Sequence, residues 1–69
     1  METEITVNGV PRRSGAGTLG ELLREMGRDP RRPGIAVAVN GEVVPRRDWE
    51  ARSLGPGDAV EIVGAVQGG

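Results

Sequence analysis

Apolar and polar residues alternate near the start of the chain. Ile5 and Val7 stand two apart in a predicted strand over residues 4–8, as expected for a strand with one buried face. Asn8-Gly9 follows, and this pair favours a tight hairpin because both residues tolerate a positive φ. The chain then predicts a returning strand, and Pro11 places it at an edge of the sheet because proline cannot donate to a ladder.

The hydrophobic period changes from two to 3.6 after a Ser-Gly-rich loop. Thr18 and Glu21 have the spacing of a capping box, with Thr18 at the N-cap and Glu21 three residues later. Gly27 is a natural C-terminal cap. The helix between them is amphipathic, and its apolar stripe consists of Leu19, Leu22, Leu23 and Met26. The charged residues opposite are spaced i, i+3, which predicts ion pairs within the helix.

The second half of the chain predicts three more strands. Residues 35–39 are apolar throughout, which is typical of a strand buried on both faces. Asn40-Gly41 repeats the hairpin signal, and a returning strand ends at Pro45. The last strand, over 59–63, alternates again, with Val60 and Ile62 on one face.

A short helical turn is expected between the fourth and last strands. It begins at Pro45 and brings Trp49 to the edge of the core. Trp49 is the only aromatic residue of the chain, so we expect it to be structural. Arg46 and Arg47 are expected on the solvated surface.

The element order is β-β-α-β-β-turn-β. It predicts an α+β fold of the β-grasp (ubiquitin-like) type, a mixed sheet with one main helix across one face. We expect residues 1–63 to form a single β-grasp domain and residues 64–69 to form a flexible C-terminal tail that ends in Gly-Gly.

Composition excludes several kinds of chemistry. The 69 residues include no cysteine and no histidine, which removes disulfides, thiolate catalysis and the commonest general base and metal ligand. We therefore expect no catalytic residue, no metal and no cofactor. The formal net charge of −1 gives no reason to expect nucleic-acid binding. No signal peptide and no apolar run of about 20 residues is present, so we expect a cytoplasmic location and no membrane contact.

The chain stops at Gly68-Gly69, which is its most specific chemical feature. Glycine has no Cβ, so an extended di-glycine can pass through a slot that other residues would block. The carboxylate of Gly69 is unhindered, and a partner enzyme could activate it with ATP as an acyl adenylate. The alternative is a compositional accident, because the chain contains 12 glycines and unused termini are common.

The chain resembles the sulfur-carrier proteins of bacterial thiamine biosynthesis, the ThiS family. The resemblance is strongest in the second half, where the pattern reads V-N-G-x-V-V-P-R-x-x-W over residues 39–49, then G-D-x-V-E-I-V over residues 57–63, then the terminal Gly-Gly. The first half matches more loosely, through residues 5–9 and 18–23. Together these segments cover essentially the whole chain.

The resemblance implies a carrier that is not itself an enzyme. A ThiF-like adenylating enzyme would join AMP to Gly69, a sulfur donor such as a cysteine desulfurase would displace AMP, and thiazole synthase would consume the resulting thiocarboxylate. The tail residues that would thread into these partners are Ala65, Val66, Gln67 and Gly68. Val60 and Ile62 on the last strand are expected to contribute to the partner interface, as apolar residues that a small domain leaves exposed.

Three alternatives remain open at the level of sequence. Small subunits of molybdopterin synthase share the fold and the Gly-Gly end, although they usually carry prolines before it and a more aromatic last strand. Carriers for other pathways, such as protein-bound cysteine synthesis, end in the same way. A β-grasp docking module with an inert tail belongs to a different class, and it would keep its function without its last residue.

Overall fold

The computed structural model describes residues 2–31 and 33–64. The predictions for residues 65–69 therefore concern residues outside the described part of the chain. The elements within it are, in chain order, β1 (Thr3–Val7), β2 (Val10–Ser14), α1 (Leu19–Glu25), β3 (Ile35–Val39), β4 (Glu42–Val43), a 3₁₀ turn (Arg46–Asp48) and β5 (Ala59–Gly64). The predicted element order is confirmed.

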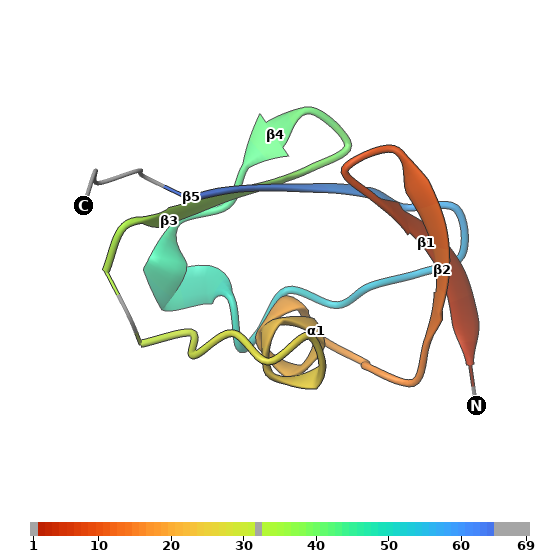
Figure 1. Cartoon of the computed structure of the whole chain (residues 1–69), viewed down its shortest axis with the longest axis horizontal. Helices are drawn as coiled ribbons and strands as arrows, with labels where there is room; N and C mark the ends of the chain where they lie inside the picture. Colours follow the sequence, from red (N-terminus) through yellow and green to blue (C-terminus); the bar gives the residue numbers. More distant parts are fainter. Residues whose placement is uncertain (1, 32, 65–69) are drawn as a thin grey trace.

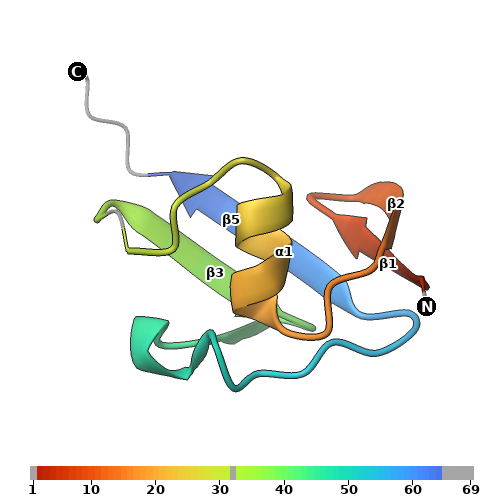
Figure 2. The ribbon, with the colours of Figure 1, turned by 90° about the horizontal axis from the view of Figure 1, so that it is seen from below.

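The strands form a mixed five-stranded sheet in the order β2-β1-β5-β3-β4. β5 pairs in parallel with β1 and antiparallel with β3, so the last strand occupies the centre. The helix crosses one face of the sheet, and no element of the described residues covers the other face (Figures 1 and 2). This is the predicted α+β arrangement of β-grasp type, with β2 at an edge as Pro11 indicated.

Both Asn-Gly pairs make the predicted hairpin turns. Asn8 and Gly9 have φ values of 51° and 82°, and Asn40 and Gly41 have φ values of 54° and 82°. Positive φ at both central residues gives a turn whose twist matches that of the flanking strands. The registers place Val7 opposite Val10 and Val39 opposite Glu42.

The helix is capped partly as predicted and partly by a distant segment. The Thr18 side chain accepts from the Glu21 amide at 3.2 Å, but the Glu21 carboxylate accepts from Gly17 N–H at 2.7 Å rather than from Thr18. The amides of Leu19 and Gly20 donate to the carbonyls of the segment after the 3₁₀ turn, Arg52 and Trp49 respectively, each at 2.9 Å. The backbone N–H groups at the start of the helix, which have no acceptor within it, thereby bond to a segment distant in the sequence.

At its other end the helix closes around Gly27, which has a φ of 80°. Gly27 N–H donates to the Arg24 carbonyl at 3.0 Å, and Arg28 N–H donates to the Leu23 carbonyl at 2.8 Å. These two bonds form a Schellman motif, which needs a left-handed residue and therefore favours glycine. The C-terminal cap predicted at Gly27 is confirmed.

The predicted ion pairs within the helix are replaced by pairs with other elements. Arg24 binds Glu50 near the 3₁₀ turn. Glu25 accepts from Arg12 at 3.2 Å and from the Ser14 hydroxyl at 2.6 Å, both on β2. The charged face of α1 therefore ties the helix to its neighbours.

The core lies between the sheet and the helix. Its buried residues come from every strand except β2 and β4, from the helix and from the connection after β4; they are Ile5, Val7, Leu19, Leu22, Leu23, Val37, Val39, Val44, Trp49, Val60 and Ile62. Met26 of the predicted helical stripe is only partly buried against this cluster.

One expectation about β3 is wrong. The strand is not buried on both faces: Val37 and Val39 face the helix, whereas Ala36 is exposed and Ala38 half-buried on the other face. Alanine is apolar but small, so exposing the alanines of this apolar run on the bare face of the sheet costs little free energy.

Trp49 is buried, as predicted, with 2% of its surface exposed. Its indole N–H donates to the Val44 carbonyl at 2.8 Å. The Arg46 guanidinium lies 4.6 Å from the centre of the ring and also donates to the Pro30 carbonyl. Arg46 is therefore not simply a solvated side chain, because it links the 3₁₀ turn to the loop before β3.

Asp58 anchors the turn that leads into β5. Its carboxylate accepts from Gly55 N–H at 2.8 Å and from the Asn40 side-chain amide at 3.1 Å. The bond from Gly55, followed by that from Asn40, holds the pKa of Asp58 below its ordinary value of 3.8.

No helix in residues 2–31 and 33–64 has the length and apolar character needed to cross a membrane.

We predict that Trp49→Ala costs about 3–5 kcal/mol in the free energy of unfolding, because it removes the largest buried side chain. Domains of this kind are often stable by only about 5 kcal/mol, so the variant should be largely unfolded at 37 °C. Urea unfolding followed by circular dichroism measures the loss. Trp49→Phe is the control, because it keeps a ring and loses the bond to Val44. A Trp49→Ala midpoint equal to that of the wild type would contradict the role in the core.

We predict that Asp58→Asn lowers stability at neutral pH and that its difference from the wild type shrinks in acid. A depressed folded-state pKa means that the ionised carboxylate stabilises the fold above the unfolded pKa. This contribution is lost as the pH falls through the lower, folded-state pKa. Urea midpoints measured for both proteins between neutral pH and the onset of acid unfolding test this. A difference that stays constant over that range would contradict it.

Candidate functional site

The predicted sulfur-carrying residue, Gly69, lies outside the described residues, as do the predicted threading residues Gly68, Gln67, Val66 and Ala65. The structure instead shows where the chain leads into them. β5 runs through the middle of the sheet to Gly64, one residue further than predicted, and Gly64 lies opposite Ile35 of β3. The candidate site is therefore the end of the central strand and the surface around it.

Val60 and Ile62 do not lie on an exposed surface. They are 0% and 6% exposed, packed beneath the helix. The expectation that a small domain leaves these two residues exposed is wrong. The alternation predicted for β5 is confirmed, but Val60 and Ile62 fill the core, and the side chains next to them along the strand face outwards.

The outward side chains of β3, β4 and β5 form a small apolar surface on the bare side of the sheet. Val43 and Val63 are 74% and 63% exposed. In the register, Ala36 lies opposite Val63, and Ala38 lies opposite both Val43 and Glu61. We call this surface the apolar face; it consists of Ala36, Ala38, Val43, Glu61 and Val63.

The apolar face does not extend over the whole sheet. On β1 and β2, the outward positions include the pair Glu4 and Arg13 and the pair Thr6 and Pro11. The bare side is therefore apolar beside the end of β5 and more polar towards the β2 edge. A partner that follows β5 to its end meets the apolar half.

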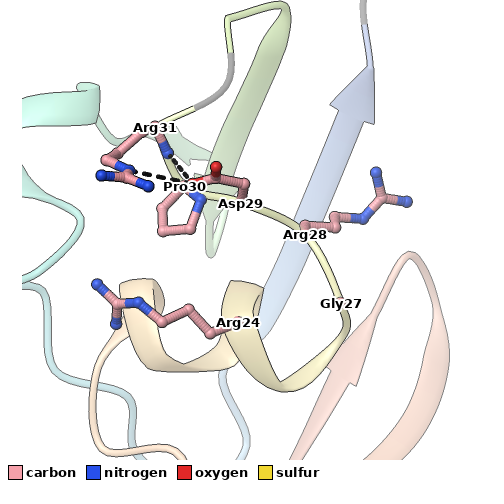
Figure 3. A pocket seen from close by; sticks show the side chains of 6 residues that line it. All are labelled: Arg24, Gly27, Arg28, Asp29, Pro30 and Arg31. Carbon is pink, nitrogen blue, oxygen red and sulfur yellow. Dashed lines mark hydrogen bonds and ion pairs between the residues drawn. The ribbon is translucent and has the colours of Figure 1, made fainter.

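Arginine side chains surround a pocket at the loop between α1 and β3 (Figure 3). Asp29 accepts from the Arg31 backbone amide at 2.9 Å, and its side chain lies 3.5 Å from Arg31 Nε. Arg24 is bound to Glu50. Arg28 points away from Arg24 and Arg31 in this view, and it lines a neighbouring pocket that includes Gly64. Since Arg24 and Arg31 are already engaged by carboxylates, we place no substrate site in this pocket.

Two turn residues hold β5 by their side chains. Ile62 N–H donates to Asn8 Oδ1 at 2.8 Å, and Asn8 Nδ2 donates to the Ile62 carbonyl at 3.3 Å. At the other end of the strand, Ala59 N–H donates to Asn40 Oδ1 at 2.9 Å. The sequence predicts a role in turns alone for both asparagines. It contains no signal for these bonds, because Asn8 and Ile62 are 54 residues apart.

Taken together, the described site has a defined strand end and an apolar surface beside it. The carboxylates, guanidinium groups and amides around it make structural contacts or are exposed to solvent. This arrangement can present a chain end to another protein.

Comparison with known proteins agrees with this arrangement. A family model described as the ThiS family matches residues 5–69. The chain is 40% identical to the sulfur carrier protein ThiS of Thermus thermophilus over 65 residues, which are 94% of this chain and 98% of the relative. It is 35% identical to the sulfur carrier protein ThiS of Escherichia coli over 52 residues, 75% of this chain and 76% of the relative.

Solved structures show the same likeness. The crystal structure of the thiamine biosynthesis protein ThiS from Geobacter metallireducens superposes with a TM-score of 0.79 at 34% identity, covering 97% of this chain and all of that one. The solution structure of a thiamine biosynthesis protein from the same organism gives a TM-score of 0.77 at 31% identity, with 97% and 88% covered. From the residues matched and the fold shared, this chain belongs to the ThiS family.

Proposed function

We propose that this protein is a sulfur carrier of thiamine biosynthesis and that the C-terminal carboxylate of Gly69 is the group that carries sulfur. The observation that supports this most directly is the match to the ThiS family, which runs to residue 69 and therefore includes the Gly-Gly. Two relatives that match most of this chain are named sulfur carrier proteins.

The proposed chemistry has two stages. A Gly69 carboxylate oxygen attacks the α-phosphorus of ATP in a ThiF-like adenylating enzyme, and pyrophosphate leaves. The terminal sulfur of a persulfide, such as that of a cysteine desulfurase, then attacks the acyl carbon, and AMP leaves. A thiol then attacks the desulfurase sulfur of this acyl disulfide and forms a disulfide with it, and the other sulfur leaves on Gly69 as a thiocarboxylate, which thiazole synthase consumes.

The composition suits a carrier whose partners supply the catalytic groups. The chain has no cysteine to bear a persulfide and no histidine to move protons. We therefore propose that the protein is a substrate of its partner enzymes rather than an enzyme, and that it acts with them in the cytoplasm.

The end of β5 gives the tail a fixed starting point. Five residues follow Gly64, and an extended chain of five residues spans at most about 18 Å. We propose that Ala65, Val66, Gln67 and Gly68 cross a narrow entry channel of the partner and bring Gly69 to its active site. Because glycine has no side chain, the last two residues fit where that channel is tightest.

We propose that the apolar face is where the adenylating enzyme docks. A partner that receives the tail must approach the end of β5, and the apolar face continues along the same strand through Val63. Contiguous exposed apolar patches on soluble proteins tend to mark interaction sites, and Val43 and Val63 belong to such a patch with Ala36 and Ala38. The proposed docking residues are thus the outward-facing neighbours of Val60 and Ile62, rather than those two residues themselves.

We predict that deleting Gly69 abolishes thiocarboxylate formation without unfolding the protein. Deletion moves the carboxylate back by about 3.3–3.6 Å, whereas displacements of about 1 Å can cost about 10²-fold in rate. Every described core residue lies before the tail, so the melting curve should be unchanged. Intact-protein mass spectrometry after incubation with ATP, the adenylating enzyme and a sulfur donor detects the exchange of one oxygen for sulfur.

The wild type treated identically is the control for that experiment. Thiocarboxylate on the shortened chain at the wild-type level, or none on the wild type, would contradict the carrier proposal. A shortened chain that still binds the adenylating enzyme, as we expect, separates docking from chemistry.

We predict that Val63→Asp weakens binding to the adenylating enzyme about 10-fold, because docking would bury the new charge on the part of the apolar face next to the end of β5. Val10→Asp is a matched control: Val10 is also 63% exposed, but it lies on the β2 edge opposite the buried Val7, on the helix side of the sheet. Isothermal titration with the purified enzyme measures both affinities. Equal losses in the two variants would place the docking surface elsewhere.

A further inference from the structure

β5 loses its neighbour on one side before the strand ends. β1 pairs with β5 at only two positions, Thr6 with Ala59 and Val7 with Val60, and the chain then turns away. The last backbone bond of this ladder runs from Asn8 N–H to the Val60 carbonyl at 2.8 Å. Backbone groups two residues apart in a strand point to the same side. The N–H and C=O of Ile62 therefore face a position where β1 no longer supplies a backbone.

The Asn8 carboxamide occupies that position. It accepts from Ile62 N–H at 2.8 Å and donates to the Ile62 carbonyl at 3.3 Å. A carboxamide offers one carbonyl acceptor and an NH₂ donor, as a peptide group offers a carbonyl and an N–H. The side chain thus extends the parallel ladder by one residue beyond the end of β1. On the other side, β3 follows β5 as far as Gly64.

Asn40 provides the comparison within the same molecule. It also precedes a glycine in a hairpin turn, with a φ of 54° against 51° for Asn8. Its carboxamide also binds β5, accepting from Ala59 N–H at 2.9 Å and donating to Asp58 at 3.1 Å. The side chains of the two asparagines therefore both hydrogen-bond to the backbone of β5, at opposite ends of the strand. Asn40 holds the beginning of β5, and Asn8 holds its end.

We infer that Asn8 is a positioning residue for the carrier reaction: its carboxamide holds the end of β5 and so sets the direction in which the chain continues beyond Gly64. This inference rests on the proposed function. Ile62 is only two residues before Gly64, and with Asn8 in place both its N–H and its C=O are hydrogen-bonded on the side that β1 has left, while β3 pairs with the strand on the other side. Without the carboxamide, β3 alone would hold the end of the strand.

Holding the end of β5 affects how tightly the carrier binds its partner enzyme rather than the rate of the chemical step. A segment that is already held in the direction required by a partner loses less conformational freedom when it binds. Once the tail is inside the partner, the partner's channel fixes Gly69, and the chemical step is the same. Loss of Asn8 should therefore raise the KM for the carrier, by about 5-fold for the two bonds removed, and leave kcat unchanged.

The test compares Asn8→Gly with Asn40→Gly in the full-length chain. Glycine keeps the positive φ that each turn requires and removes only the carboxamide. Amide hydrogen exchange measured by NMR is the first readout and needs no partner. Asn8→Gly should lose protection at Ile62 and keep it at Ala59, and Asn40→Gly should do the reverse. Retained protection of Ile62 in Asn8→Gly would overturn the inference.

The second readout is the steady-state kinetics of adenylation by the ThiF-like enzyme of the same organism, with the carrier as the varied substrate. Asn8→Gly should raise KM about 5-fold at unchanged kcat, while Asn40→Gly keeps the wild-type KM. Asn8→Asp retains the acceptor for Ile62 N–H, so its KM should lie between those of the wild type and Asn8→Gly. Equal KM values for the wild type and Asn8→Gly, or equal increases in both glycine variants, would overturn the positioning role.

Failure of the proposed function gives a different result. A wild-type chain that the enzyme never adenylates would overturn the carrier proposal, and with it the positioning role. The exchange pattern at Ile62 would in that case show Asn8 as a structural ligand of β5 only. Normal adenylation of the wild type combined with unchanged kinetics of Asn8→Gly would overturn the inference alone.

Discussion

β5 hydrogen-bonds to a parallel neighbour on one side and to an antiparallel neighbour on the other, and the positions of the other elements follow from that. Val60 and Ile62 on this strand face the helix and pack with residues from β1, β3 and α1. Removing β5 would separate the β1–β2 hairpin from the β3–β4 hairpin, because no other strand joins them. The last element in the sequence is thus the one that completes the sheet.

The same strand also leads towards Gly69, the residue proposed to carry sulfur. A small domain cannot enclose a substrate pocket in its own core, since a chain of this size buries only about 60% of its unfolded surface. In the proposed function, the central strand is instead the base from which the chain end reaches a partner enzyme. Side chains hold that strand at both ends: Asp58 and Asn40 at its beginning, and Asn8 near Gly64.

Long-range contacts also decide how the helix is fixed. Its N-terminal amides donate to the segment that follows the 3₁₀ turn, and a Cβ on Gly20 would lie only 2.5 Å from the Glu50 carboxylate. Arg24 binds this same glutamate, and Trp49 fills the core just before it. The segment 49–52, directly after the 3₁₀ turn, therefore supports both the helix and the core.

The sequence by itself determined the local elements and the family. The period-2 alternation around Ile5 and Val7, the stripe of leucines after Thr18 and the two Asn-Gly turns depend on neighbouring residues, and the structure confirms each of them. Only the tertiary structure decided what those elements face. Alternation shows that Val60 and Ile62 share a side of β5 but not which side the helix covers, since that depends on how the strands are ordered in the sheet. The bonds from Asn8 to Ile62 and from Arg24 to Glu50 likewise join residues far apart in the chain, so no local pattern encodes them.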